Sequence, residues 1–184
     1  MDVPEHVRQN IAQLMKELAP VARGARWMRS DGMHITLKFI GEAAPEMVDH
    51  VKTSLADIRS TGPVGMRFRG VGCFPNERRP RVLWAGMEAT PNLSALAADI
   101  KRLIVSLGLP REERAFSPHL TLARFNALGS QPRLAEAMRE LAAREFGAMR
   151  TCEFHLYQSQ LRPGGAEYTR LATFAFAAAE SAEQ

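Results

Sequence analysis

The sequence predicts an α+β fold of two similar lobes, each a mainly antiparallel sheet with helices on its outer face. Two observations support this prediction. The same order of helices and strands runs twice along the 184 residues, and one His-x-Thr segment occupies the same place in each run. Such a repeat indicates a pseudo-two-fold axis, with the two segments facing each other in the cleft between the lobes.

The spacing within the two halves is closely matched. A proline that starts a helix precedes the motif histidine by 30 residues in the first half and by 28 in the second. The histidine precedes the next such proline by 11 and by 13 residues. These counts run between Pro4, His34 and Pro45 and between Pro91, His119 and Pro132.

Hydrophobic periodicity locates the individual elements of the first half. Apolar residues at three- and four-residue steps predict helices, and strict alternation predicts strands. The predicted elements are a helix from Pro4 to Leu18, a strand over 33–40, a helix from Pro45 to Ile58, and strands over about 65–74 and 81–88 joined by a polar loop at 75–80.

The second half follows the same order. Proline favours the first turn of a helix and glycine its end. The predicted elements are a helix from Pro91 to Gly108, a strand over 119–124, a helix over 132–145, and strands over about 150–161 and 166–176 around a turn at 163–165. Residues 1–176 therefore form one domain of two lobes, and residues 177–184 a C-terminal tail.

The repeat also reveals a gap at the N-terminus. A strand over 81–88 precedes the helix that begins at Pro91, but only three residues precede Pro4. Either the true start lies upstream, or the first lobe has a smaller sheet with an unpaired edge. Because exposed edges are a liability, we favour the first explanation and expect a missing N-terminal strand.

Composition excludes several classes of protein. Apolar residues make up 46% and charged residues 24%, which is ordinary for a globular protein. No run of 18 apolar residues and no secretion signal occurs, so we expect a cytoplasmic protein without a membrane span. Cys73 and Cys152 lie in apolar, strand-like contexts and are expected to be buried free thiols. The net charge is +4, and most of the basic residues are arginines. This charge suits an anionic partner, but it is only weak evidence for one.

The two motifs carry the chemistry. In a strand, residues i and i+2 share a face, so His34 projects with Thr36 and His119 with Thr121. Histidine gives or takes protons near neutral pH, and two histidines in different protonation states supply an acid and a base in one step. A threonine hydroxyl is suited to holding a phosphate oxygen or an imidazole tautomer. A single His-x-Thr segment is very weak evidence for a functional site. Two such segments at the same place in a repeat predict one site that both form together.

The motifs H-I-T-L and H-L-T-L resemble the paired motifs of the two-histidine (2H) phosphoesterase superfamily. The chain is most similar to the RNA 2',3'-cyclic phosphodiesterases, also called 2'-5' RNA ligases. Further segments read like that family in its order over about residues 4–175. They are R-W-M-R-S-D-G-M-H-I-T-L-K-F-I-G, G-V-G-C-F-P, R-P-R-V-L-W-A-G, F-S-P-H-L-T-L-A-R and E-F-H-L-Y-Q-S. Members of the family open with a short apolar strand that this sequence lacks, in agreement with the gap.

The resemblance implies a role for each motif residue. His34 would be the proton donor to the departing ribose 3'-oxygen, and His119 the proton acceptor that activates water. The product would be a 2'-phosphomonoester. Thr36, Thr121 and Arg124 would bind the phosphate. Only the resemblance separates acid from base, and in the reverse direction the roles would exchange, with possible 2'-5' ligation of RNA.

Other candidate residues are interpreted as structural. His6 and His50 are expected in solvent on helices, His155 as a structural residue of a strand, and Trp84 in the core. The sequence contains no H-E-x-x-H motif and no clustered Cys/His spacing, so neither a metal nor a cofactor is expected. The basic loop 76–81, with Arg67 and Arg69, either follows an RNA backbone or is simply solvated.

Three functions therefore stay open at the level of the sequence. The first is hydrolysis of RNA 2',3'-cyclic ends without a metal, by a monomer whose partner is RNA. The second keeps the site but takes a small cyclic phosphate derived from a nucleotide. The third is a basic RNA-binding module without catalysis, against which the two intact motifs argue.

Overall fold

The computed structural model describes residues 1–126, 129–162 and 165–176. Its helices are α1 (Glu5–Leu18), α2 (Pro45–Leu55), α3 (Pro91–Ser106) and α4 (Pro132–Glu140), with a short 3-10 helix η1 (Ser30–Gly32). Its strands are β1 (Ala25–Trp27), β2 (Val64–Phe74), β3 (Val82–Ala89), β4 (His119–Phe125), β5 (Glu145–Thr151), β6 (Glu153–Arg162) and β7 (Gly165–Ala175).

Proline and glycine set the helix boundaries as predicted. A proline occupies the first turn of α2, α3 and α4, and Pro4 directly precedes α1. Helix α3 ends at Ser106 and is followed two residues later by Gly108, whose φ of +80° is a left-handed conformation that glycine adopts without strain. The amides of Gly108 and Leu109 then donate to the carbonyls of Val105 and Ile104, which satisfies the last turn.

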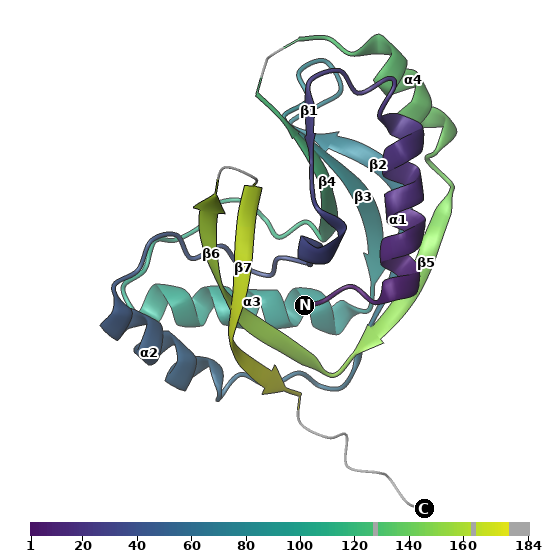
Figure 1. The fold of residues 1–184 in the computed structure, drawn as a ribbon. Coiled ribbons are helices and arrows are strands. Elements are labelled where there is room, and N and C mark those ends of the chain that lie inside the picture. Colours follow the sequence, from purple (N-terminus) through teal and green to yellow (C-terminus); the bar gives the residue numbers. More distant parts are fainter. Residues whose placement is uncertain (127–128, 163–164, 177–184) are drawn as a thin grey trace, which may run out of the picture.

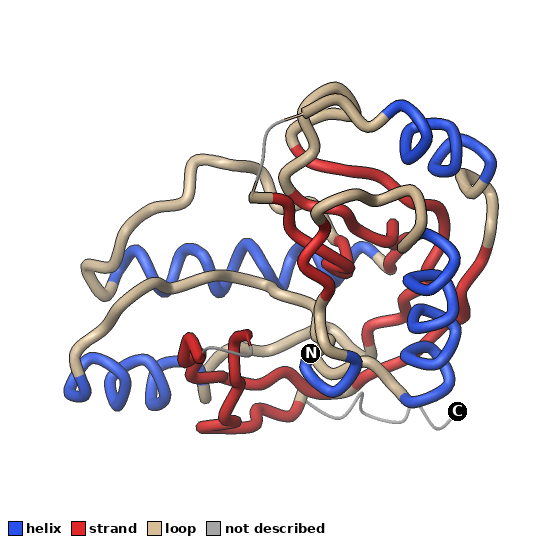
Figure 2. The backbone as a smooth tube through the Cα atoms, turned by 45° about the horizontal axis from the view of Figure 1, so that its top comes forward, coloured by secondary structure: helices blue, strands red, loops and turns tan. Residues whose placement is uncertain are grey.

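Two groups of elements build the molecule (Figure 1). The first is a curled five-stranded antiparallel sheet of order β1-β4-β3-β2-β5, against which α1 and α4 pack. The second is the β6–β7 hairpin, which lies near the pair α2 and α3. Long loops over residues 35–44 and 109–118 link α2 and α3 to the centre of the molecule, as Figure 2 shows.

A single core joins the two groups. Helix α1 buries one face against the sheet, because its apolar residues recur at three- and four-residue steps. The same cluster of buried side chains includes residues of α2, α3 and the β6–β7 hairpin, where the rings of Phe154 and Phe174 stack at 5.0 Å. None of the helices in the described ranges is long and apolar enough to cross a membrane.

The predicted strand over residues 33–40 is not a regular strand. His34 forms an isolated antiparallel bridge with Asp2, and the backbones of Met1 and Ile35 exchange hydrogen bonds of 2.9 and 3.0 Å. The segment 1–3 thus occupies the neighbouring position in which the repeat requires a strand. Beyond Ile35 the chain enters the loop to α2, and Phe39, predicted on the apolar face, is 69% exposed.

Several other predictions also differ from the structure. The predicted strand over 150–161 is two strands in different sheets, separated at Cys152, and the predicted helix over 132–145 ends at Glu140. Strand β1 was not predicted, because three residues are too few for a periodic pattern. Cys73 is buried as expected, but Cys152 is exposed at the junction of β5 and β6. Residues 163–164 of the predicted turn and the tail 177–184 lie outside the described residues.

Candidate active site

His34 follows η1 and is held in place by its backbone and by its ring. Its neighbours Met33 and Ile35 are 4% and 1% exposed, so the alternation turns the half-buried imidazole away from the core. The Nδ1 atom of His34 lies 2.8 Å from the carbonyl oxygen of Gly32. The ring of Tyr168 meets the imidazole edge-on, with 4.5 Å between the ring centroids. Hydrogen bond and ring contact together fix the side chain.

His119 begins β4 and is held in the same manner. Its Nδ1 atom lies 2.7 Å from the carbonyl oxygen of Ser117. The ring of Phe74, at the end of β2, meets the imidazole edge-on at 5.1 Å. The two histidines of the repeat therefore share one arrangement, in which the carbonyl two residues earlier and one aromatic ring fix each side chain.

The shared arrangement decides which nitrogen of each imidazole exchanges protons. A carbonyl oxygen only accepts hydrogen bonds, so Nδ1 must carry a hydrogen in both His34 and His119. In the described part of the chain, no protein group bonds either Nε2 atom. Each Nε2 is therefore left to give or take a proton, while Nδ1–H remains bonded in either state.

Burial tunes the first histidine. Removal from water lowers the pKa of His34, and the nearby N-terminal ammonium adds to this effect, while the Gly32 carbonyl and the Asp2 carboxylate oppose it. The imidazole is therefore held mainly in its neutral form near neutral pH in the absence of an anion. A bound phosphate would favour the protonated form.

The pairing of β1 with β4 directs both histidine segments toward the same end of β4. The amide of Met28 donates to the carbonyl of Leu122 at 2.8 Å, which extends the pairing of β1 with β4. Leu122 is three residues from His119, and the chain reaches His34 six residues after Met28. Pairing of β1 with β4 thus directs the chain that leads to His34 toward the end of β4 at which His119 lies.

The remaining predicted site residues follow the two histidines. Thr121 is partly buried two residues after His119 on β4, and the core residues Leu120 and Leu122 project to the opposite face. Thr36 is exposed two residues after His34. In the described residues neither threonine hydroxyl is engaged in a hydrogen bond, so both are open to a ligand.

A β-bulge determines where Arg124 projects. Five residues separate it from His119, an odd number that would place the two side chains on opposite faces of a regular strand. Leu83 pairs with Ala123 but Trp84 pairs with Thr121, so β4 carries one extra residue at Leu122. Leu122 and Ala123 are both buried, and the exposed Arg124 returns to the face of His119.

Trp84 was predicted in the core but lies on the His119 face of the sheet. It pairs with Thr121, is only half-buried, and has its ring 5.3 Å from that of Phe74. A side chain at Gly72 would come within 2.3 Å of the indole, so glycine is needed beneath it. In the described ranges the buried indole Nε1 has no hydrogen-bond partner. The alternation was right, and the error lay in the choice of face.

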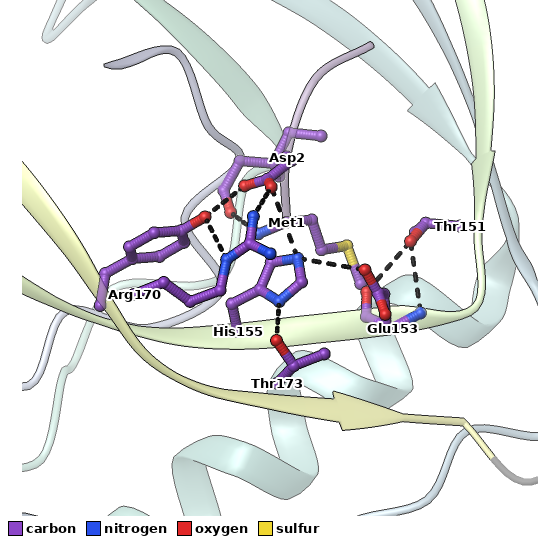
Figure 3. Close-up of polar contacts among 9 residues, drawn as sticks. Met1, Asp2, Thr151, Glu153, His155, Arg170 and Thr173 are labelled. Atoms are coloured by element: carbon purple, nitrogen blue, oxygen red, sulfur yellow. Dashed lines mark hydrogen bonds and ion pairs between the residues drawn. The ribbon is translucent and has the colours of Figure 1, made fainter. Parts of the chain in front are cut away.

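A polar cluster supports the His34 side of the site (Figure 3). The Asp2 carboxylate accepts hydrogen bonds from Tyr157 and Arg170 of the β6–β7 hairpin. Burial alone would raise the pKa of Asp2, but the Tyr157 hydroxyl and the charges of His155 and Arg170 lower it. Asp2 therefore stays ionised and ties the hairpin to the segment paired with His34. Sequence reasoning missed this cluster, because Asp2 lies more than 150 residues from its partners Tyr157 and Arg170.

The other histidines agree with the structural interpretation. The His155 side chain is 2% exposed and bonds Thr173 through Nδ1 at 3.0 Å. His50 is exposed on α2, and His6 is exposed but bonds the Ala148 carbonyl at 3.0 Å.

Next to His34, a hollow of about 340 Å³ is lined by Asp2, Arg8, Gly32, Met33, Tyr157, Tyr168 and Arg170.

Replacing Tyr168 by alanine should raise the pKa of His34 toward its ordinary value of about 6.5, because the imidazole regains contact with water. Tyr168→Phe keeps the ring and should leave the pKa low. Titration of the imidazole by NMR measures both. An unchanged pKa in the alanine variant would show that another group buries His34. Since the folded protein binds this proton less readily than the unfolded chain, the stability due to neutral His34 is lost as pH falls below about 6.5.

Comparisons with known proteins agree with the fold and identify the family. The family model described as LigT like phosphoesterase matches residues 1–84 and 87–168. The chain is 33% identical to an RNA 2',3'-cyclic phosphodiesterase of Archaeoglobus fulgidus, over 95% of this chain and 96% of that protein. It is 31% identical to a protein of the same name from Methanothermobacter thermautotrophicus, over 95% of each.

A solved structure from Thermus thermophilus superimposes with a TM-score of 0.77 at 30% identity, covering 96% of this chain and 94% of that one. The match confirms the predicted fold of two lobes. The fold and the family model together define a phosphoesterase of the two-histidine class. The chain belongs to the LigT-like phosphoesterase family.

Proposed function

We propose that the protein hydrolyses 2',3'-cyclic phosphodiester ends of RNA to 2'-phosphomonoesters, without a metal. The observation that carries the proposal is the identical anchoring of His34 and His119, which leaves the Nε2 atom of each histidine for proton transfer. The names of the relatives, RNA 2',3'-cyclic phosphodiesterase, support the substrate.

The proposed reaction is a single displacement at phosphorus. His119 accepts a proton from water through Nε2, and the water oxygen forms a bond to phosphorus. The bond from phosphorus to the ribose 3'-oxygen breaks, and His34 donates its Nε2 proton to that oxygen. Thr36, Thr121 and Arg124 hold the non-bridging oxygens, where negative charge grows in the transition state. The 2'-ester bond survives, so the product is the 2'-phosphomonoester.

The same site accounts for 2'-5' ligation. A 5'-hydroxyl of a second RNA end takes the place of water, gives its proton to His119, and forms the bond to phosphorus. The leaving 3'-oxygen again receives its proton from His34, so the two histidines keep their hydrolytic roles, whereas the sequence led us to expect that they would exchange them. Because the 2'-ester bond is retained, the new linkage is 2'-5'.

We further propose that residues 1–176 act as one domain and as a monomer. The single core shared by both groups of elements supports one domain, and each motif histidine finds its anchors within one chain. An RNA substrate favours the cytoplasm as the place of work.

Two substrates compared side by side test the proposal. We expect turnover of an oligonucleotide with a 2',3'-cyclic end to exceed that of 2',3'-cyclic AMP, and EDTA to leave both rates unchanged. Release of the 2'-phosphomonoester, followed by chromatography, measures both. Faster turnover of the mononucleotide would favour a small cyclic phosphate as the substrate. Binding of the oligonucleotide without turnover would favour a non-catalytic RNA-binding module. Loss of activity with EDTA and recovery with zinc or magnesium would contradict the two-histidine mechanism.

A further inference from the structure

Two arginines lie directly opposite each other in the sheet beside the candidate site. Strand β1 pairs with β4 in a register that sets Arg26 across from Arg124. Side chains of directly paired residues share a face of the sheet, and the bulge in β4 places this face on the side of His119 and Thr121. Both arginines are exposed. The two arginine side chains therefore leave neighbouring strands side by side, on the face that carries His119.

The pair is not neutralised by the protein. Like charges directly opposite on neighbouring strands are destabilising. Within the described residues, neither Arg26 nor Arg124 makes an ion pair or a side-chain hydrogen bond, whereas Arg67, Arg69 and Arg144 of the same sheet region each meet a glutamate. A repulsive pair without carboxylates fits a surface that receives anions.

The two arginines are at different distances from the motif residues. Arg124 lies on β4, the strand of His119 and Thr121, and is the arginine that the proposed reaction uses at the cyclic phosphate. Arg26 lies on β1, the edge strand of the sheet, about 4.8 Å farther out. A substrate whose only phosphate is the cyclic one has no second negative charge for Arg26 to bind.

We propose that Arg26 forms a second phosphate subsite, which binds the internucleotide phosphate on the 5' side of the terminal nucleoside. This inference rests on the proposed function. A 3'-terminal cyclic phosphate has only one neighbouring phosphate, the one that joins the terminal nucleoside to the rest of the RNA. A guanidinium group suits it, because its planar donors match phosphate oxygens. Arg26 would thus distinguish an RNA end from a small cyclic phosphate.

The test compares two substrates that differ by this one phosphate, 2',3'-cyclic AMP and the dinucleotide ApA with a 2',3'-cyclic end. In the Arg26→Gln protein we expect kcat/KM for the dinucleotide to fall about tenfold, the lower range for a hydrogen bond to a charged group. Turnover of the mononucleotide should stay within about twofold. The salt dependence of oligonucleotide binding should weaken by about 0.7 in logarithmic slope, as for one phosphate contact on a single strand.

Arg150→Gln is the matched control, since Arg150 is an exposed arginine on β5, the opposite edge of the same sheet. It should change neither substrate. Equal losses on both substrates in Arg26→Gln would show that Arg26 acts at the reacting phosphate and would overturn the subsite, as would no loss on either.

The subsite and the proposed function fail in different ways. Binding of a 3'-phosphorylated ApA, measured by calorimetry, does not depend on turnover. If the wild-type protein cleaves neither cyclic substrate, the proposed function is wrong, and the calorimetry alone decides on Arg26. Weaker binding by Arg26→Gln, with wild-type binding by Arg150→Gln, would support the subsite. Equal binding by both variants would overturn it.

Discussion

Replacing His34 or His119 by alanine should lower turnover of a 2',3'-cyclic RNA end by at least about a hundredfold, because each residue supplies a proton transfer that is typically worth about 10² to 10⁴ in rate. The fold should survive, since neither imidazole belongs to the apolar core. Asparagine at either position tests the anchoring directly. Its amide can still donate to the Gly32 or Ser117 carbonyl, but it cannot transfer a proton.

The exposed His50 on α2 provides the control, and His50→Ala should retain wild-type turnover. Rates are followed at saturating substrate, and circular dichroism reports the fold. Turnover near the wild-type level in any of the four site variants would contradict the assignment.

The pH dependence separates the two roles. The wild-type profile should be bell-shaped, because one histidine must be protonated and the other neutral. If His34 is the proton donor, residual activity of His34→Ala should no longer fall at high pH. If His119 is the acceptor, residual activity of His119→Ala should no longer fall at low pH. Profiles with these limbs exchanged would reverse the assignment of acid and base.

Much of the fold could be predicted from the hydrophobic periodicity of the sequence and from the prolines and glycines at the ends of its helices. Proline at the start of each helix and Gly108 at the end of α3 act locally, so the helix starts could be predicted without knowledge of the tertiary structure. The pairing of β1, of β5 and of segment 1–3 depends on partners far along the chain. Their local patterns are too short to reveal those partners.

The candidate site likewise has a part that could be predicted from local sequence and a part that could not. Its residues could be proposed from two motifs in a repeat, because side-chain identity is written in the sequence. The groups that hold the imidazoles could not be predicted from the sequence. Two of them are backbone carbonyls, and the others, Tyr168 and Phe74, come from distant strands. The bulge at Leu122 is equally hidden, and without it the spacing places Arg124 on the wrong face.

Gly86→Ala should destabilise the protein by about 2 kcal/mol, within the range of about 1–3 kcal/mol for overpacking a well-packed site. Gly86 pairs with His119 in the register of β3 with β4. A β-carbon built at Gly86 would lie 2.3 Å from the carbonyl oxygen of Arg69, in the stretch where β2 is irregular between Phe68 and Val71. That atom belongs to the backbone, so the strand itself must move.

The same movement should reach the site. Strand β3 lies between β2 and β4, so a shift of β2 from β3 disturbs the sheet directly opposite His119. We expect a lower midpoint of thermal unfolding together with reduced turnover. Gly129→Ala is the control, because its β-carbon meets no atom within 4 Å. If Gly86→Ala melts and turns over like Gly129→Ala, the irregular stretch of β2 yields at little cost, and close packing there does not position the strand that carries His119.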